Sequence, residues 1–150
     1  MMRCLELGWL STLLAACVGC GGGANLPDTV PVSGKVALNG KPLTNASVTF
    51  IPAGITRGEG GFGTTDQEGR YELTYLRGSS GVPVGEYRVV INKRVMPDGS
   101  DADEGPDVAP IESQARELLH PKYSNEQHTT LSATVPEGGG SVDFNLSTDK

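Results

Sequence analysis

The sequence predicts an all-β domain built as a sandwich of two sheets, and three observations support this prediction. The 150 residues contain 21 glycines and 10 prolines, which is too many for a helical protein. These glycines and prolines fall between short apolar runs, as they do between strands and turns. Within the runs, apolar and polar residues alternate with the period of two that is typical of half-buried strands. About seven antiparallel strands at this spacing favour a sandwich.

Each predicted strand has one row of side chains that we expect to face the core. The strands are predicted at residues 30–38, 46–51, 71–75, 85–91, 129–135 and 142–146, with a strand end at 64–65. The inward rows are Val36, Leu38, Val48, Phe50, Tyr71, Leu73, Tyr75, Tyr87, Val89, Ile91, Leu131, Ala133, Val135, Val142, Phe144 and Leu146. Because successive side chains of a strand point to opposite faces, each row can cover one side of a common core.

Turn residues separate these strands. Asn39-Gly40 suits the positive φ angles of a tight hairpin. Asp66 and Gly69 form a candidate structural turn motif, in which the Asp66 side chain bonds its own backbone and Gly69 takes a left-handed conformation. Residues 53–63 predict a glycine-rich loop.

The rest of the chain is expected to be irregular. We expect Pro52 to end the second strand. Residues 93–127 form a long segment in which residues 111–119 predict one short helix, closed by His120-Pro121.

The first twenty residues, MMRCLELGWLSTLLAACVGC, are similar to a bacterial lipoprotein signal peptide. Their apolar core of about 12 residues is shorter than the ~20 that a membrane-spanning helix needs. Cys17, with Leu14 three positions before it, and Cys20, which leads into a glycine tether, are the two candidates for acylation, for instance with palmitate. An ordinary secretory signal or an uncleaved anchor is the alternative.

The predicted organisation is therefore a signal peptide with lipobox at 1–20, a tether at 21–29, a sandwich domain at 30–147 and a tail at 148–150. The three cysteines, Cys4, Cys17 and Cys20, all lie in the leader region, so the domain has no disulfide and must be stabilised by packing. The net charge of −6, without clustered basic residues, argues against nucleic acid as a partner.

Five short segments follow one another along the chain: Val32-Ser33-Gly34-Lys35-Val36, Asn39-Gly40-Lys41-Pro42-Leu43, Ala46-x-Val48-x-Phe50-x-Pro52, Thr65-Asp66-x-x-Gly69-Arg70-Tyr71 and Gly85-x-Tyr87-x-Val89-x-Ile91. In this order they resemble the carboxypeptidase regulatory-like, or transthyretin-like, domain. With the leader, the chain resembles small bacterial lipoproteins built from one such domain. The resemblance covers roughly residues 30–147 and implies a Greek-key β-sandwich. It does not imply peptidase activity, because in metallocarboxypeptidases this domain accompanies a separate catalytic domain.

Few residues offer catalytic or metal chemistry. A weak calcium candidate is the acidic run Asp98, Asp101, Asp103 and Glu104, although its spacing departs from the EF-hand pattern. The only histidines, His120 and His128, fit no compact metal motif, and His120 is expected at the end of the predicted helix. Gly58-x-Gly60-x-x-Gly63 matches a dinucleotide fingerprint only formally, because a turn rather than a helix is expected after it. No cofactor is expected.

These observations favour a non-enzymatic protein, held by its lipid on the outer or cytoplasmic membrane of the cell envelope, that contacts a protein or cell-wall partner. The expected contact surface is residues 93–127 and the loop 53–63, since loops on a rigid sandwich usually carry recognition. One alternative is a carbohydrate-binding module, with Tyr75 or Tyr123 as exposed aromatic rings. Another is a transthyretin-like hydrolase of cyclic ureides, although the C-terminal residues 144–148 lack the motif that such an enzyme requires.

Overall fold

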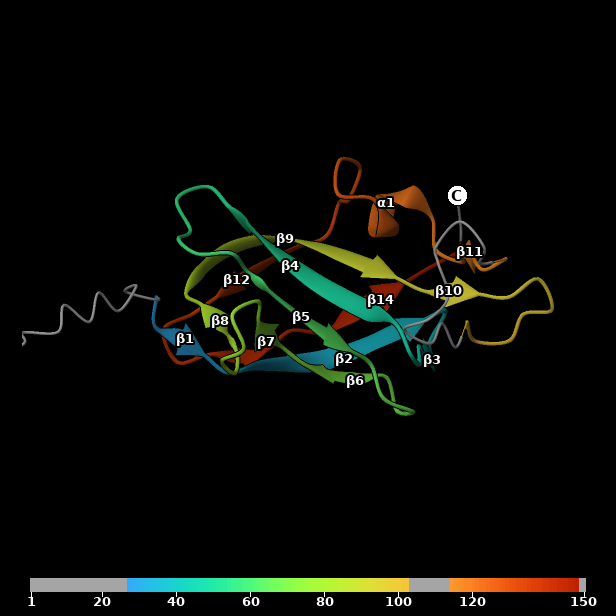
Figure 1. The fold of residues 1–150 in the computed structure, drawn as a ribbon, viewed down its shortest axis with the longest axis horizontal. Coiled ribbons are helices and arrows are strands. Elements are labelled where there is room, and N and C mark those ends of the chain that lie inside the picture. The colour runs from blue at the N-terminus through green and yellow to red at the C-terminus, as the bar shows by residue number, and fades with distance from the viewer. Residues whose placement is uncertain (1–26, 103–113, 149–150) are drawn as a thin grey trace, which may run out of the picture.

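Two sheets pack face to face in the part of the chain that the computed structural model describes, residues 27–102 and 114–148 (Figure 1). Sheet I has the order β12-β9-β4-β5-β7 and consists of β4 (Ser47–Ala53), β5 (Gly61–Thr64), β7 (Thr74–Tyr75), β9 (Gly85–Asn92) and β12 (Ser132–Val135). Sheet II is centred on β2 (Val32–Leu38) and adds β3 (Lys41–Pro42), β6 (Arg70–Glu72), β13 (Gly140–Ser141) and β14 (Phe144–Leu146). The predicted all-β sandwich is confirmed.

Two short ladders and one helix complete the described part of the chain. β1 (Thr29–Val30) pairs with β8 (Val82–Pro83), and β10 (Arg94–Val95) pairs with β11 (Arg116–Glu117). The helix α1 covers Pro121–Ser124. Since β1 begins at Thr29, regular structure starts inside the predicted tether.

The core lies between the sheets and contains the predicted inward rows. All of these side chains are buried except Leu38, Leu131 and Val142, which are half-buried and pack against the others. Phe50 occupies the centre of the aromatic contacts, with its ring centroid 5.6 Å from Tyr87, 6.3 Å from Phe144 and 6.5 Å from Tyr71. Such pairs add to the free energy of burial because their rings meet at favourable tilts.

Residues 71–75 do not form the single strand that the sequence predicts. β6 pairs with β2 in sheet II, whereas β7 pairs with β5 in sheet I, and Leu73 lies between them. The backbone N–H of Leu73 donates to the carbonyl of Val32. Tyr71, Leu73 and Tyr75 all face the core that the two sheets share. Their period of two therefore continues across the change of sheet and looks like one strand in the sequence. The chain therefore crosses from one sheet to the other here and closes one edge of the sandwich.

Pro52 does not end its strand, contrary to the expectation. β4 continues through Pro52, which pairs with Tyr87 of β9. On the other side, β5 pairs with β4 only as far as Phe50. Beyond Phe50, β4 is an edge strand toward β5, and a proline is tolerated there because no partner needs its missing N–H. The glycine-rich loop accordingly shortens to 54–60, and β5 begins at Gly61.

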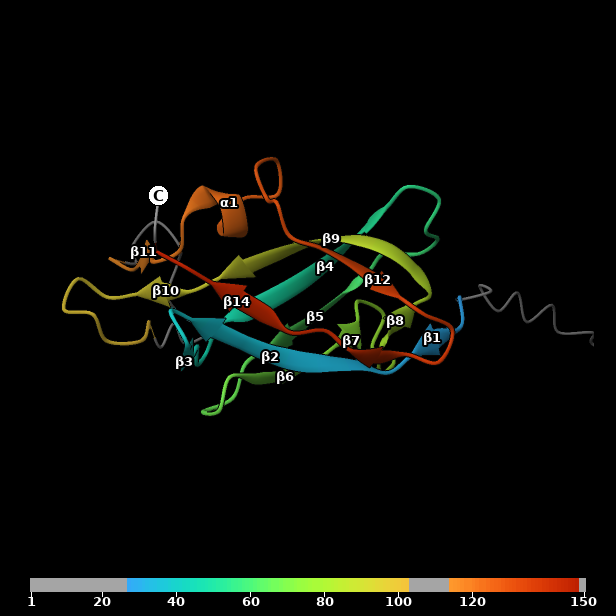
Figure 2. The same cartoon turned by 180° about the vertical axis from the view of Figure 1, so that it is seen from behind.

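The last strands run parallel to β2 rather than antiparallel. Phe144, Asn145 and Leu146 of β14 lie opposite Val36, Ala37 and Leu38. Figure 2 shows β14 beside β2 from behind. The turn after β12 carries the chain from sheet I to sheet II, so β12 and β14 are not joined as a hairpin. The direction of β14 is therefore set by the crossing between sheets.

Candidate functional site

The two ends of the sandwich carry different segments of the chain. β4 runs from Ser47, opposite Asn92, to Ala53, opposite Glu86. The residues that follow β9 therefore lie at one end, and the loop that follows β4 lies at the other. We call residues 93–102 and 114–128 the distal end, and residues 27–28, 54–60 and 83–86 the tether end. Figure 1 shows β1 and β10 at opposite ends of the ribbon.

This arrangement divides the predicted contact surface between two ends of the molecule. Of the two segments expected to form it, residues 93–127 begin beside Asn92, opposite Ser47, whereas the loop 53–63 begins at Ala53, at the other end of β4. The later part of the first segment returns along sheet I, where Glu126 contacts Arg88, opposite Ile51. At about 3.4 Å per residue, the seven residues of β4 span more than 20 Å. Residues 93–102 and the loop 54–60 therefore lie at different ends of the sandwich.

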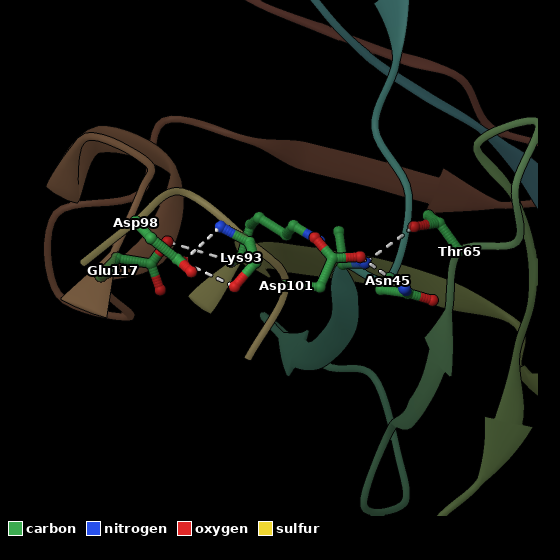
Figure 3. Close-up of polar contacts among 8 residues, drawn as sticks. Asn45, Thr65, Lys93, Asp98, Asp101 and Glu117 are labelled. Carbon is green, nitrogen blue, oxygen red and sulfur yellow. Dashed lines mark hydrogen bonds and ion pairs between the residues drawn. The ribbon is translucent and has the colours of Figure 1, made fainter. Parts of the chain in front are cut away.

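A buried lysine holds the base of the distal end (Figure 3). The side chain of Lys93 is only 5% exposed, and its Nζ lies 2.5 Å from Oδ1 of Asp101. The side-chain amide of Asn45 donates to Oδ2 of the same carboxylate at 2.6 Å. These two hydrogen bonds, first that from Lys93 and then that from Asn45, hold the pKa of Asp101 below its ordinary value. The contact fixes the segment after β10 to the start of β4.

Glu117 stabilises the other side of the distal end by accepting hydrogen bonds from three residues. Its Oε1 accepts hydrogen bonds from the backbone N–H groups of Lys93, at 3.0 Å, and Leu119, at 2.9 Å. Its Oε2 accepts from the side-chain amide of Asn92 at 3.1 Å. Figure 3 shows Glu117 beside Lys93, on the side away from Asn45. The β10–β11 ladder is thus fixed by side chains from two directions and forms a rigid platform.

The predicted helix at 111–119 is wrong in its described part. Residues 114–120 contain β11 and no helix, and residues 111–113 lie outside the described residues. The helix instead starts at Pro121, where the predicted helix was expected to end. Proline suits the first helical position because the N–H that it lacks has no helical partner there. His120 is the N-cap rather than a C-terminal residue, and its Nδ1 accepts from the backbone N–H of Lys122.

The calcium candidate is not assembled by the described residues. The carboxylate of Asp101 is engaged by Lys93 and Asn45, as above. Oδ1 of Asp98 accepts from the hydroxyl and the backbone N–H of Ser100, and these bonds lower the pKa of Asp98. Asp103 and Glu104 lie outside the described residues. Across residues 27–102 and 114–148, no three His, Cys, Asp or Glu side chains are placed to hold a metal ion, and this includes His120 and His128.

The two tyrosines expected to be exposed for sugar binding are buried. Tyr75 is covered between the sheets, and Tyr123 packs from α1 against the core. Tyr75 faces inward on β7 and Tyr123 is the buried residue of α1, so neither ring can stack on a sugar. Phe62, which lies between Thr49 and Thr74 on the outer face of sheet I, is the exposed aromatic side chain within the described ranges.

Asp66 and Gly69 lie in one turn. Oδ1 of Asp66 accepts from the backbone N–H groups of Glu68, at 2.8 Å, and Arg70, at 2.9 Å. Gly69 has a φ of 73°, a left-handed value that favours glycine. The bond from the Arg70 N–H contributes most to lowering the pKa of Asp66. The turn has a complete structural role without any ligand.

A polar groove of about 660 Å³ adjoins this turn on the outer face of sheet II. Lys35 lies opposite Arg70, and Ser33 lies opposite both Glu72 and Ser141, so their side chains share that face. Charged groups of both signs and hydroxyls line it, including Lys35, Glu72 and Ser141. This groove can offer hydrogen bonds to a polar molecule but no aromatic ring, because Tyr71 turns its ring inward and donates its hydroxyl to the carbonyl of Val142.

Sequence reasoning missed Lys93 and Asn45. A signal for Lys93 was present, because it continues the inward row of Tyr87, Val89 and Ile91 with the same period of two. A lysine in such a row needs a buried partner, and the acidic run downstream supplies one. Asn45 has no comparable signal, since its role depends on a contact across 56 residues.

The candidate acylation sites, Cys17 and Cys20, lie outside the described residues. Within residues 27–102 and 114–148, no helix has the length and apolar character to cross a membrane.

Comparisons with known proteins identify no family for this chain. No family model matches the sequence, and no curated protein sequence matches it. Among solved structures, a 9R-lipoxygenase from Cyanothece is similar at 18% sequence identity with a TM-score of 0.37. The match covers 80% of this chain but only 16% of the lipoxygenase.

Proposed function

We propose that this chain is a non-enzymatic, lipid-anchored protein of the bacterial cell envelope that presents its distal end to a protein or cell-wall partner. The acylated residue is Cys17 or Cys20, and the domain is related to the transthyretin-like modules that its motifs resemble. The observation that carries the proposal is the placement of the distal end, which lies across the sandwich from Glu86 and from Pro27 of the predicted tether, which line one groove. A lipid on that tether would leave the distal end facing away from the membrane.

The construction of the distal end supports a role in recognition. Lys93 and Glu117 fix its backbone, whereas Arg116 and Leu118 remain exposed on it, with Leu118 45% exposed. A rigid backbone lowers the entropy lost on binding, because the surface is already ordered. An exposed arginine beside an exposed leucine is also a composition enriched at protein interfaces.

Site-specific photocrosslinking in cells tests this proposal. A photoreactive residue at Arg116 or Leu118 is expected to capture one envelope component. The matched control is Glu137, an exposed residue after β12, whose last residue Val135 pairs with Gly85 near the tether end. Point substitutions are preferable to deleting residues 96–110, because that deletion also removes Asp101 and leaves Lys93 buried without its partner.

Two outcomes would contradict the proposal. Capture from Glu137 but not from Arg116 or Leu118 would remove the distal end as the contact surface. Retention of full capture in a Cys17→Ala, Cys20→Ala double variant that no longer sediments with membranes would show that anchoring plays no part.

The polar groove favours a second candidate function, the binding of a polysaccharide by hydrogen bonds. Its charges of both signs and its hydroxyls suit a polar chain lying across sheet II. Glu72→Gln and Ser141→Ala change exposed groove residues, and the groove function predicts that both weaken retention on cell-wall polysaccharide. Phe62→Ala, on the other sheet, is the control. Equal retention of all variants would exclude the groove.

A further inference from the structure

The tether end has an exposed apolar surface. A groove of about 760 Å³ lies there, and apolar side chains contribute much of its lining: Pro27, Ile55, Pro83 and Val84. Ile55 is 100% exposed and Val84 is 41% exposed. Leu76, also exposed, lies beside this surface, because its backbone N–H donates to the carbonyl of Gly60 at the base of the loop that carries Ile55. Three large apolar side chains thus lie in water at one end of the sandwich.

The charges around this surface are mixed. Asp28, Arg57 and Glu86 line the groove, and nearby Arg77 is paired with Glu59 at 2.5 Å. No cluster of lysines or arginines accompanies the apolar residues within these segments, so attraction to anionic lipid does not explain them. Any contact here must gain its free energy from burial of apolar area.

The position of the tether identifies what lies against this end. Pro27, the first described residue, itself lines the groove. Six residues, 21–26, separate Pro27 from Cys20, and nine residues, 18–26, separate it from Cys17. At no more than about 3.6 Å per residue, these tethers reach about 25 Å and 36 Å. A protein acylated at either cysteine therefore keeps this end within reach of the bilayer surface.

We infer that the tether end, led by Ile55 with Val84 and Leu76, inserts into the interfacial layer of the bilayer that carries the lipid anchor. The inference rests on the proposed function, since it requires acylation. The loop tip is a second membrane contact besides the acyl chains, and two contacts at one end orient the sandwich. The distal end then points away from the bilayer rather than lying along it.

Tryptophan fluorescence tests the insertion directly. The chain has one tryptophan, Trp9, which precedes both candidate cysteines, so the processed protein has none. Ile55→Trp places a single fluorophore on a side chain that is fully exposed, and Leu118→Trp places the matched control at the distal end. Each full-length variant is processed in a bacterial envelope and reconstituted in phosphatidylcholine vesicles with and without brominated acyl chains. Mass spectrometry of the mature protein reports the acyl chains.

The expected result is a blue-shifted emission from Ile55→Trp that brominated lipid quenches and that high salt leaves unchanged, while Leu118→Trp emits as in water and is not quenched. An acylated, vesicle-bound Ile55→Trp with water-like, unquenched emission would overturn the inference and leave the proposed function standing. A mature protein without acyl chains would overturn the proposed function and this inference together. Equal quenching of both variants would also overturn the inference, because it would mean that the sandwich lies flat on the bilayer.

Discussion

The ion pair between Lys93 and Asp101 joins two residues in very different surroundings. The Nζ–Oδ1 distance is 2.5 Å, yet the lysine side chain is 5% exposed and the aspartate side chain is 43% exposed. The cation has therefore lost its water, whereas the carboxylate keeps much of its own. The cost of breaking this pair depends on which partner is removed.

Asp101→Asn is expected to destabilise the domain more than Lys93→Met. The first change leaves a buried ammonium beside a neutral amide, which we expect to cost about 1–3 kcal/mol, below the usual range for a fully buried pair because water reaches Asp101. The second change keeps an apolar stem of similar shape and leaves a carboxylate that water can solvate, so the expected cost is under about 1 kcal/mol. Chemical denaturation followed by circular dichroism measures both.

Asp98→Asn is the control for this comparison, because Asp98 is exposed and its Oδ1 accepts hydrogen bonds from Ser100 in the same turn. Its expected loss of unfolding free energy is small. Equal losses for Asp101→Asn and Lys93→Met would show that the two partners are solvated alike, contrary to the structure.

The sequence predicted the sandwich because its strands follow the period of two so regularly. Tyr87, Val89 and Ile91, for example, are all buried as expected. The same period wrongly predicted a single strand at residues 71–75, because a chain that crosses from one sheet to the other can keep every second side chain in the core. It also predicted nothing about Lys93, since a charged residue in an inward row has meaning only once its partner is placed. The ends of the sandwich could not be assigned from sequence either, because this requires the register of β4 against β9.

Acid is expected to weaken the fold through aspartates whose pKa values are lowered, namely Asp66, Asp98 and Asp101. Their folded pKa values lie below the unfolded value of about 3.9, so their stabilisation is present above that pH and is lost as pH falls through the folded values. The denaturant concentration at the unfolding midpoint should therefore decrease when the pH falls below about 4. Asp101→Asn should show a shallower drop than the parent. Parallel profiles for the two proteins would remove Asp101 as a source of the acid sensitivity.

Alkali is expected to weaken the fold through buried tyrosines. Burial is the main cause that raises the pKa of Tyr87 to about 12, and burial also raises the pKa of Tyr71. Because the folded state holds these protons more tightly, stability is full below the unfolded pKa of about 10 and falls as pH rises above it. Ultraviolet absorbance of tyrosinate should show these two side chains ionising together with unfolding.

Tyr87→Phe removes the hydroxyl of Tyr87 and keeps its ring, so it measures the contribution of the hydroxyl alone. The hydroxyl donates to the carbonyl of Pro83 at 2.6 Å, so its loss should cost about 1 kcal/mol at neutral pH. The variant should also lose less stability than the parent between neutral and alkaline pH, because one proton-linked group is gone. An unchanged alkaline profile would mean that Tyr87 does not contribute to it.

Gly34→Ala is expected to be among the most damaging substitutions in the sandwich. A Cβ at this position would lie 1.8 Å from the carbonyl oxygen of Val142, which belongs to the backbone between β13 and β14. That backbone cannot withdraw without breaking the pairing of both strands with β2, so we expect a loss of about 3 kcal/mol or more.

Gly138 and Gly99 are controls that distinguish the steric clash at Gly34 from the general effect of replacing a glycine by alanine. A Cβ at Gly138 meets nothing within 4 Å, and its alanine variant should change the unfolding free energy by less than about 0.5 kcal/mol. Gly99 is equally open but has a φ of +86°, so Gly99→Ala should cost about 1–2 kcal/mol from backbone strain alone. The expected order of stability is therefore Gly138→Ala, then Gly99→Ala, then Gly34→Ala. If Gly34→Ala were as stable as Gly138→Ala, β13 and β14 could not lie against β2 in the register described here, and the closure of sheet II would have to be revised.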